Sequence, residues 1–343
     1  MKSLRGGVIF INGMDVLMPL LREAQQMSAT DVHFLLQPSS EKVQAQYRAH
    51  GTIFNGSQLS YEAYQSLLRH LKFSASLDIG EERRPQSGSY TIMVKSQPLD
   101  LRISTLPGIP LEHLTIRILS STILPFEKLS IFPTAHQHIL PLLNAPHGLF
   151  LLCGPTGAGK TTTLYALLKT IQKTTKKRII TLEDPVEQQI EGVVQLQINE
   201  AAGFHYEEGL RSVMRHDPDV IVISEIRDAL TAKWVIRASM TGHLVLSTIH
   251  GSHPYSAARR FLEYGIQLLD LEESLLGILS QRLATLATAN RLISRPRAAV
   301  FDLAIGQAWK RSAAGEGLAK ELRKAYAYGF ITENEWRRWF PSS

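Results

Sequence analysis

Cysteine is almost absent from this chain, because Cys153 is the only one in 343 residues. An intrachain disulfide and a zinc site built from several cysteines are therefore excluded. The sequence also has no continuous apolar run of about 18 residues, the length of a membrane-spanning helix. Residues 1–15 lack the apolar segment and the cleavage site of a secretory signal. These absences predict a cytosolic protein.

The overall composition is ordinary for a globular protein, with 44% hydrophobic and 20% charged residues. The length indicates two or three domains. A net charge of +6 permits attraction to nucleic acid or to an anionic membrane surface but establishes neither. The basic cluster at 173–178 is interpreted as a solvated helix end. The aromatic and basic tail around Arg337 and Arg338 is interpreted as a segment that docks on a partner, on a membrane surface or on the chain itself.

The most specific motif is a glycine-rich Walker A loop between an apolar run, 149–153, and a helical pattern. Its glycines let the backbone curl so that successive N–H groups face phosphate oxygens, and the following helix adds its positive dipole end. The lysine is expected to reach the β- and γ-phosphates, and the first threonine to bind Mg²⁺. The predicted nucleotide-binding residues are Gly154, Pro155, Thr156, Gly157, Ala158, Gly159, Lys160, Thr161 and Thr162. ATP with Mg²⁺ is therefore the predicted cofactor.

Two glutamates follow apolar, strand-like runs further along the chain. Glu183 comes after the run 179–182, and Glu225 comes one residue after the run 220–223. In a parallel sheet both would emerge at the edge that holds the phosphate loop, where α/β folds bind ligands. ATP hydrolysis needs a carboxylate that holds Mg²⁺ or orients water, so both are predicted to be catalytic, with Thr161 and Glu225 at the metal. A capping or surface role stays open for each.

Two histidines, His243 and His250, bracket a further predicted strand. A histidine at a strand end is often structural, but these two could also report the state of the γ-phosphate to the next element. Metal binding is disfavoured because no third ligand at a suitable spacing joins them.

Hydrophobic periodicity predicts an α+β N-terminal domain with a helix at 14–27 and strands at 31–34, 43–48, 99–104 and 115–119. From residue 148 onward, strands and helices alternate as in an α/β nucleotide-binding core. The predicted strands are 150–153, 178–182, 193–198 (which could be an edge strand), 220–223 and 243–248. The predicted helices are 161–172, 207–215, 229–240 with Asp228 as N-cap, 256–264 ending at Gly265, and 268–286. The predicted division is a domain at 1–119, a linker at 120–133, an ATPase domain at 134–290 and a helical C-terminal region at 291–343.

Four motifs in this order resemble those of the type II/type IV secretion and pilus traffic ATPases. They are Walker A from Gly154, the Asp box at 181–187, an atypical Walker B at 210–228 and the His box at 241–250. The resemblance implies a RecA-like P-loop NTPase core, catalytic roles for Glu183 and Glu225, and a nucleotide-sensing role for both histidines.

The N-terminal part resembles the PAS-like domain of the same family in the stretches 29–33, 82–88, 101–107 and 116–119. Arg102 and Arg117 match family arginines that swing onto the γ-phosphate when the two domains close. A guanidinium suits that role because it offers always-charged, bidentate donors. The absence of a four-cysteine zinc module and of an extra N-terminal domain, together with the stretch 297–302, resembles the short competence-pilus assembly ATPases of Gram-positive bacteria.

The resemblance implies a cytoplasmic ATPase that works as a ring, expected to be a homo-hexamer, at a membrane platform protein. Direct nucleic-acid binding and zinc are not expected. Ser224 stands where the family usually has glycine, and residues 251–253 also depart from it, so a nucleotide-binding scaffold without essential turnover stays open. A retraction motor and a nucleic-acid translocase stay open as well.

Overall fold

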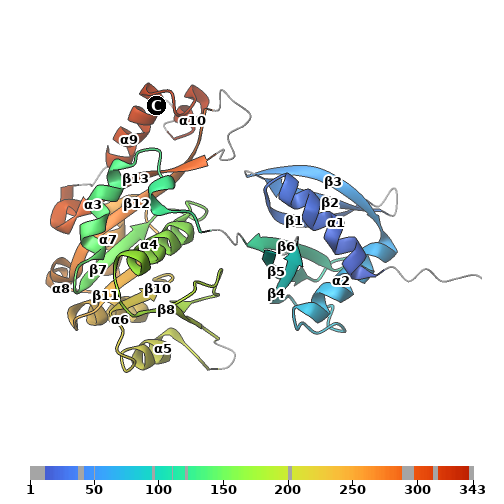
Figure 1. The fold of residues 1–343 in the computed structure, drawn as a ribbon, viewed down its shortest axis with the longest axis horizontal. Coiled ribbons are helices and arrows are strands. Elements are labelled where there is room, and N and C mark those ends of the chain that lie inside the picture. The colour runs from blue at the N-terminus through green and yellow to red at the C-terminus, as the bar shows by residue number, and fades with distance from the viewer. Residues whose placement is uncertain are drawn as a thin grey trace, which may run out of the picture. The chain divides into compact units, whose positions relative to one another are not determined.

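The computed structural model describes residues 12–37, 42–49, 51–94, 97–109, 111–119, 123–199, 203–287, 297–311 and 316–339. The chain divides into two compact units, Met1–Thr122 and Ile123–Ser343, which are described separately (Figure 1).

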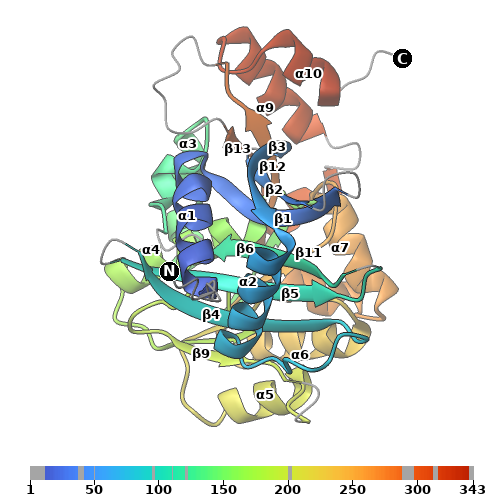
Figure 2. The ribbon, with the colours of Figure 1, turned by 90° about the vertical axis from the view of Figure 1, so that its right-hand side faces the viewer.

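The first unit is built on a six-stranded antiparallel sheet in the order β3-β2-β1-β6-β5-β4. Helices α1 (Gly13–Gln26) and α2 (Tyr61–Ser74) lie on one face of this sheet (Figure 2). They bury their apolar sides against it, including Leu17 and Leu21 of α1 and Leu67 and Leu71 of α2. The strands are β1 (Ala29–Gln37), β2 (Lys42–Ala49), β3 (Thr52–Ser60), β4 (Gln86–Val94), β5 (Gln97–Leu106) and β6 (His113–Leu119).

The helix at α1 and the strands at β1, β2, β5 and β6 confirm the sequence predictions for this unit. Helix α2 and strands β3 and β4 were not predicted. Strand β3 is exposed or half-buried along its whole length, so it lacks the alternating apolar pattern that marks a half-buried strand.

The second unit contains a seven-stranded sheet in the order β13-β12-β7-β11-β10-β8-β9. All neighbouring strands are parallel except β12 and β13, which are antiparallel. The strands are β7 (Gly148–Cys153), β8 (Ile179–Glu183), β9 (Val194–Gln197), β10 (Val220–Ile223), β11 (Leu244–Ile249), β12 (Leu275–Thr285) and β13 (Arg297–Ile305). The helices are η1 (Phe126–Lys128), α3 (Thr134–Leu143), α4 (Lys160–Thr174), α5 (Tyr206–Val213), α6 (Ala229–Met240), α7 (Pro254–Glu263), α8 (Leu268–Ser274), η3 (Gly306–Arg311), α9 (Glu316–Ala327) and α10 (Glu333–Trp339).

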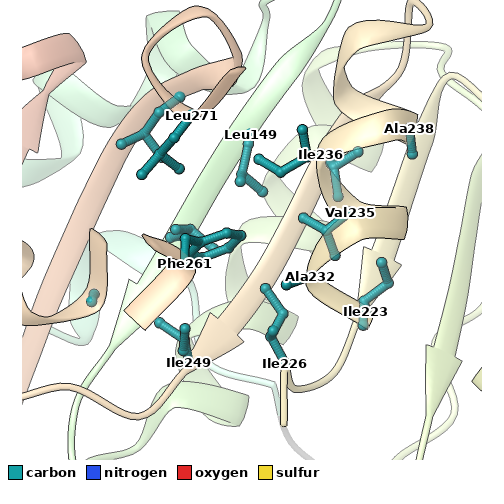
Figure 3. Packing of buried hydrophobic residues seen from close by; sticks show 14 of the residues in the cluster. Leu149, Ile223, Ile226, Ala232, Val235, Ile236, Ala238, Ile249, Phe261 and Leu271 are labelled. Carbon is teal, nitrogen blue, oxygen red and sulfur yellow. The ribbon is translucent and has the colours of Figure 1, made fainter. Parts of the chain in front are cut away.

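Apolar clusters cover both faces of this sheet. Leu149 and Cys153 of β7 face one cluster, which also holds Phe261 of α7 and Val235 of α6 (Figure 3). The alternating residue Phe150 faces the other cluster, together with residues of α3 and α4. Because the central strands are buried on both faces, they read in the sequence as continuous apolar runs.

The sequence predictions for β7, β8, β10 and β11, and for helices α4 to α7, are confirmed, and β9 is the edge strand that was expected. Asp228 caps α6 by accepting a hydrogen bond from the Thr231 N–H at 2.7 Å. Gly265 follows α7 in the left-handed region, with φ of +81°.

The helix predicted over 268–286 is wrong in its second half. Helix α8 ends at Ser274, and Leu275–Thr285 forms β12 between β7 and β13. A short apolar run fits a buried strand as well as a buried helix. The pairing of β12 with a strand on each side satisfies its backbone groups, and this pairing is a tertiary feature.

The prediction of a helical C-terminal region needs the same kind of correction. Residues 297–305 form strand β13, which joins the sheet, whereas α9 and α10 are helical as expected. The predicted linker, 120–133, overlaps a segment that packs on the second unit. Phe126 of η1 is buried there and stacks on Phe301 of β13.

Within the described ranges, none of the helices combines the length and the apolar character that crossing a membrane requires.

Candidate active site

The phosphate loop joins β7 to α4 and is curled by two glycines. Gly157 and Gly159 have φ values of +77° and +84°, in the left-handed region that favours glycine. The Lys160 ammonium folds back over the loop and donates to the carbonyl oxygens of Gly154 at 2.9 Å and Pro155 at 3.2 Å. The side chain of this lysine therefore lies against the backbone of its own loop.

The start of α4 fits a phosphate group. Its N-cap residue is Gly159, which has no side chain that could cap the first turn, so N–H groups of that turn stay available to an anion. Pro155, Thr156 and Gly157 are exposed, whereas Gly154 and Ala158 are buried and anchor the loop. The Thr161 side chain is half-buried at the helix start, and Thr162 is exposed. The residues present therefore fit a triphosphate.

The charge of Glu225 acts on this lysine. Burial lowers the pKa of Lys160. Among the neighbouring charges that oppose this shift, the negative charge of Glu225 has the largest effect. Glu225 itself accepts hydrogen bonds or ion pairs from two directions. Arg227 Nε lies 2.7 Å from Oε2, and His250 Nε2 lies 2.7 Å from Oε1. The second nitrogen group of Arg227 reaches Asp184 Oδ2 at 2.9 Å, so this arginine bridges the ends of β8 and β10.

Glu183 lies at the same sheet edge but in a different environment. Its exposed fraction is 2%, and its carboxylate accepts hydrogen bonds from three side chains. Thr181 Oγ1 lies 2.5 Å and Gln195 Nε2 2.9 Å from Oε1, and the Tyr165 hydroxyl donates to Oε2. Glu183 is therefore a buried acid held by three donors, while the Glu225 carboxylate pairs with Arg227 and His250.

The two predicted histidines lie at opposite ends of β11. His250 follows the end that carries the phosphate loop and contacts Glu225. His243 precedes the other end, where its Nδ1 lies 3.2 Å from the Ala238 carbonyl oxygen. A strand of this length separates its ends by about 20 Å, at about 3.3 Å per residue. The structure therefore does not bring His243 to the phosphate loop of its own chain.

Arg102 and Arg117 lie opposite each other on β5 and β6 of the first unit. They project from the sheet face that alternates with the buried residues Leu101 and Ile116. Arg117 Nε donates to Asp31 Oδ1 at 2.8 Å, and Arg102 Nε donates to Ser87 Oγ at 3.3 Å. The two guanidinium groups thus share one face of the first unit.

Gln281, which contacts the phosphate loop, and its neighbour Arg282 were missed from the sequence. Gln281 of β12 donates to the Ala158 carbonyl oxygen at 2.6 Å, and the adjacent Arg282 donates to Ser252 O at 2.8 Å. Burial lowers the pKa of Arg282. The helix predicted for this segment gave no reason to place these residues near the loop, because β12 lies there through its pairing with β7.

Among the described residues, no cluster of three histidine, cysteine, aspartate or glutamate side chains is placed to hold a metal ion. A magnesium ion in a nucleotide site is held differently, since it takes one or two protein oxygens plus waters and phosphate oxygens. The Thr161 hydroxyl and the Glu225 carboxylate are oxygen ligands of the type that Mg²⁺ prefers.

A curled phosphate loop, a lysine and a carboxylate at the carboxyl edge of a parallel sheet define a P-loop nucleotide-hydrolysing protein. Comparison with known proteins gives the family. Residues 12–322 match the family described as Type II/IV secretion system protein, and the chain belongs to it.

Individual relatives agree with this assignment. The chain is 38% identical over 342 residues to the competence protein ComGA of Bacillus subtilis, covering 93% of this chain and 96% of that protein. It is 37% identical over 282 residues to type II secretion system protein E of Xanthomonas campestris, covering 81% of this chain but 49% of that protein. The chain therefore spans about half the length of this second relative.

A solved structure extends the likeness to the fold. The crystal structure of the pilus retraction motor PilT with bound ADP matches with a TM-score of 0.72 and 25% identity, over 94% of this chain and 96% of that one. These findings confirm the family recognised from the four motifs and the prediction of a P-loop ATPase of secretion and pilus machines.

Proposed function

We propose that this chain hydrolyses ATP in a ring and thereby powers assembly of a competence or type IV pilus-like fibre, or of a type II secretion pseudopilus. The observation that carries the proposal is the position of Glu225, which pairs with His250 and Arg227 at 2.7 Å after β10, at the sheet edge where the phosphate loop follows β7. The similarity to ComGA over nearly the full length of both chains supports the competence variant.

In this proposal Lys160 and the N–H groups at the start of α4 bind the phosphates, with Thr156, Thr161 and Thr162 lining the loop. Bound Mg²⁺ would neutralise phosphate charge, with Thr161 and Glu225 as its protein-side partners, partly through water. Glu225 orients the attacking water, and its ion pairs with His250 and Arg227 hold the carboxylate in one orientation. Glu183 supports the same reaction from its buried position.

The motive step in this proposal is closure of the N-terminal PAS-like domain, residues 1–119, onto the ATPase domain. Arg102 and Arg117 then deliver positive charge to the γ-phosphate. For that, Arg117 must leave Asp31, to which it is bonded in this structure. His243 lies at the far end of β11, so its proposed sensing role requires a phosphate group held by a neighbouring chain of the ring.

We also propose that the ring is a homo-hexamer, that it works at the cytoplasmic face of the cell membrane, and that it binds a platform protein there. No direct contact with nucleic acid is part of this function. The tail around Arg337 and Arg338 packs partly on the chain itself, since the Thr285 N–H donates to Glu335 at 3.1 Å and Trp336 and Trp339 pack against a cluster that includes Val300.

The test is phosphate release by the purified full-length chain with Mg-ATP, together with fibre assembly in cells. Wild type is expected to turn over ATP, and Lys160→Ala is expected to abolish both turnover and assembly. Glu225→Gln is expected to keep nucleotide binding and lose both activities. Full assembly supported by Glu225→Gln would instead favour a scaffold, and fibre shortening that depends on turnover would favour retraction. The rate of ATP turnover is expected to be the same with and without DNA. Stimulation of turnover by DNA that depends steeply on salt would instead indicate a translocase.

A further inference from the structure

The second turn of α4 carries a tyrosine that contacts the buried acid of the site. The Tyr165 hydroxyl donates to Glu183 Oε2 and accepts a hydrogen bond from the Glu187 N–H at 3.2 Å. Both side chains are almost fully buried, with exposed fractions of 4% for Tyr165 and 2% for Glu183. One hydroxyl therefore joins the helix that follows the phosphate loop to the acid that ends β8 and to the segment after it.

Among the described residues, the other donors to the Glu183 carboxylate belong to the sheet. Thr181 precedes it on β8, and Gln195 lies on the neighbouring edge strand β9, and both donate to Oε1. Gln195 is itself held in place, because it also donates to the Gln188 carbonyl oxygen at 2.9 Å. Tyr165 differs from these two donors because it approaches from α4, the helix whose first turn faces the phosphates.

The phenol is suited to this position. Burial raises the pKa of Tyr165, and the charge of Glu183 and the hydrogen bond to it raise that pKa further. The hydroxyl thus stays protonated at neutral pH and remains a donor. A hydrogen bond to a charged acceptor in a buried site is among the stronger ones in proteins.

We propose that Tyr165 is a positioning residue for ATP hydrolysis: it holds the Glu183 carboxylate in the orientation that turnover requires and ties that orientation to the phosphate-loop helix. This inference rests on the proposed function, in which Glu183 takes part in hydrolysis. Tyr165 itself contacts neither nucleotide nor metal in this proposal, so its removal changes the rate and leaves binding intact.

The test uses Tyr165→Phe in the full-length chain, which keeps the buried ring and removes the hydroxyl. The expected result is a kcat about 10- to 100-fold below wild type, the range for one hydrogen bond to a charged group. The dissociation constant for a fluorescent ADP analogue is expected to stay within about twofold of wild type, because the phosphate loop is unchanged. Retained binding also reports that the variant is folded.

A matched control is Tyr64→Phe, which removes another buried phenol hydroxyl. Tyr64 lies in the first unit and donates to the Glu112 carbonyl oxygen at 2.6 Å. This control is expected to keep the wild-type kcat. A double-mutant cycle with Glu183→Gln supplies the second readout, because a tyrosine that acts through Glu183 should have little further effect once that charge is gone.

Three outcomes overturn the inference. If the kcat of Tyr165→Phe equals that of wild type, the inference is wrong, but the proposed function is unaffected. An equal loss of rate in the wild-type and Glu183→Gln backgrounds, or a loss of nucleotide affinity in parallel with kcat, assigns Tyr165 a packing role. A wild-type chain without any turnover overturns the proposed function first, so the two failures are distinguishable.

Discussion

Gly159 offers a quantitative test of the phosphate loop, because it combines a left-handed backbone with a close neighbour. Its φ is +84°, and a Cβ at this position would lie 2.9 Å from Gln281 Nε2 and 3.4 Å from Leu283 Cδ1. A left-handed conformation costs a residue with a side chain about 1–2 kcal/mol. Gly265 has nearly the same φ, +81°, but a Cβ there would meet nothing within 4 Å. Gly265→Ala is therefore the matched control for Gly159→Ala.

Both variants are expected to lower the melting temperature of the second unit by about 2–8 °C, from about 1–2 kcal/mol and about 2–4 °C per kcal/mol for a unit of this size. They should differ in nucleotide binding. The new methyl group of Gly159→Ala displaces Gln281 from the loop and shifts the first N–H groups of α4, so Mg-ATP affinity should fall at least about tenfold, equivalent to about 1.4 kcal/mol. Gly265→Ala should bind as wild type does.

The assays are thermal unfolding without nucleotide and calorimetric titration with Mg-ATP, on the same preparations. Equal affinities for Gly159→Ala and Gly265→Ala would refute the reasoning, because the loop would then bind phosphate without its left-handed turn. A Gly159→Ala variant that is as stable as wild type would refute the assigned backbone conformation.

Three further predictions concern stability and are measured by urea unfolding. Burial alone raises the pKa of Asp31, but the hydrogen bond and charge of Arg117 and a hydrogen bond from Thr30 hold it below the usual 3.8. Wild type should therefore lose stability as pH falls through that lowered pKa, and Asp31→Asn should show a flatter acid limb below about pH 4. Lys72→Met should cost about 3–5 kcal/mol because it leaves the buried Glu112 unpaired, and adding Glu112→Leu should restore most of that loss. Phe126→Ala should destabilise the second unit by about 3–5 kcal/mol, whereas an effect below about 1 kcal/mol would mean that this segment is not part of its core.

The sequence specified the phosphate loop and the strands that lead to it almost completely. The motif from Gly154 to Thr162 is local, because the glycines and the helix that shape its turn follow one another along the chain. The sequence also predicted the positions of Glu183 and Glu225, because both follow apolar runs and the ends of parallel strands meet at one edge of the sheet. Those runs are recognisable because a strand buried on both faces has no polar alternation.

The segment 268–286 illustrates what local patterns leave open. Its apolar residues fit a helix, and the strand β12 forms because β7 and β13 provide hydrogen-bonding partners on both sides. Gly277 lies in the middle of this run and argues against a helix there, since glycine destabilises a helix interior. With that error the contact of Gln281 with the phosphate loop, and that of Arg282 with Ser252, were missed as well.

The tertiary structure also separated residues that the sequence had treated as equivalent. His250 and His243 flank one strand, yet only the first reaches Glu225, because a strand carries its two ends to opposite edges of the sheet. The two glutamates share an edge, yet Glu183 is held by Thr181, Gln195 and Tyr165, while Glu225 pairs with Arg227 and His250. The amino-acid sequence by itself determined the nucleotide loop, the family and the positions of both acids, because these depend on short-range backbone geometry and on order along the chain. Which acid is buried, and which donors hold it, was decided by the packing of α4 and β9 against β8, since contacts between distant segments exist only after the chain has folded.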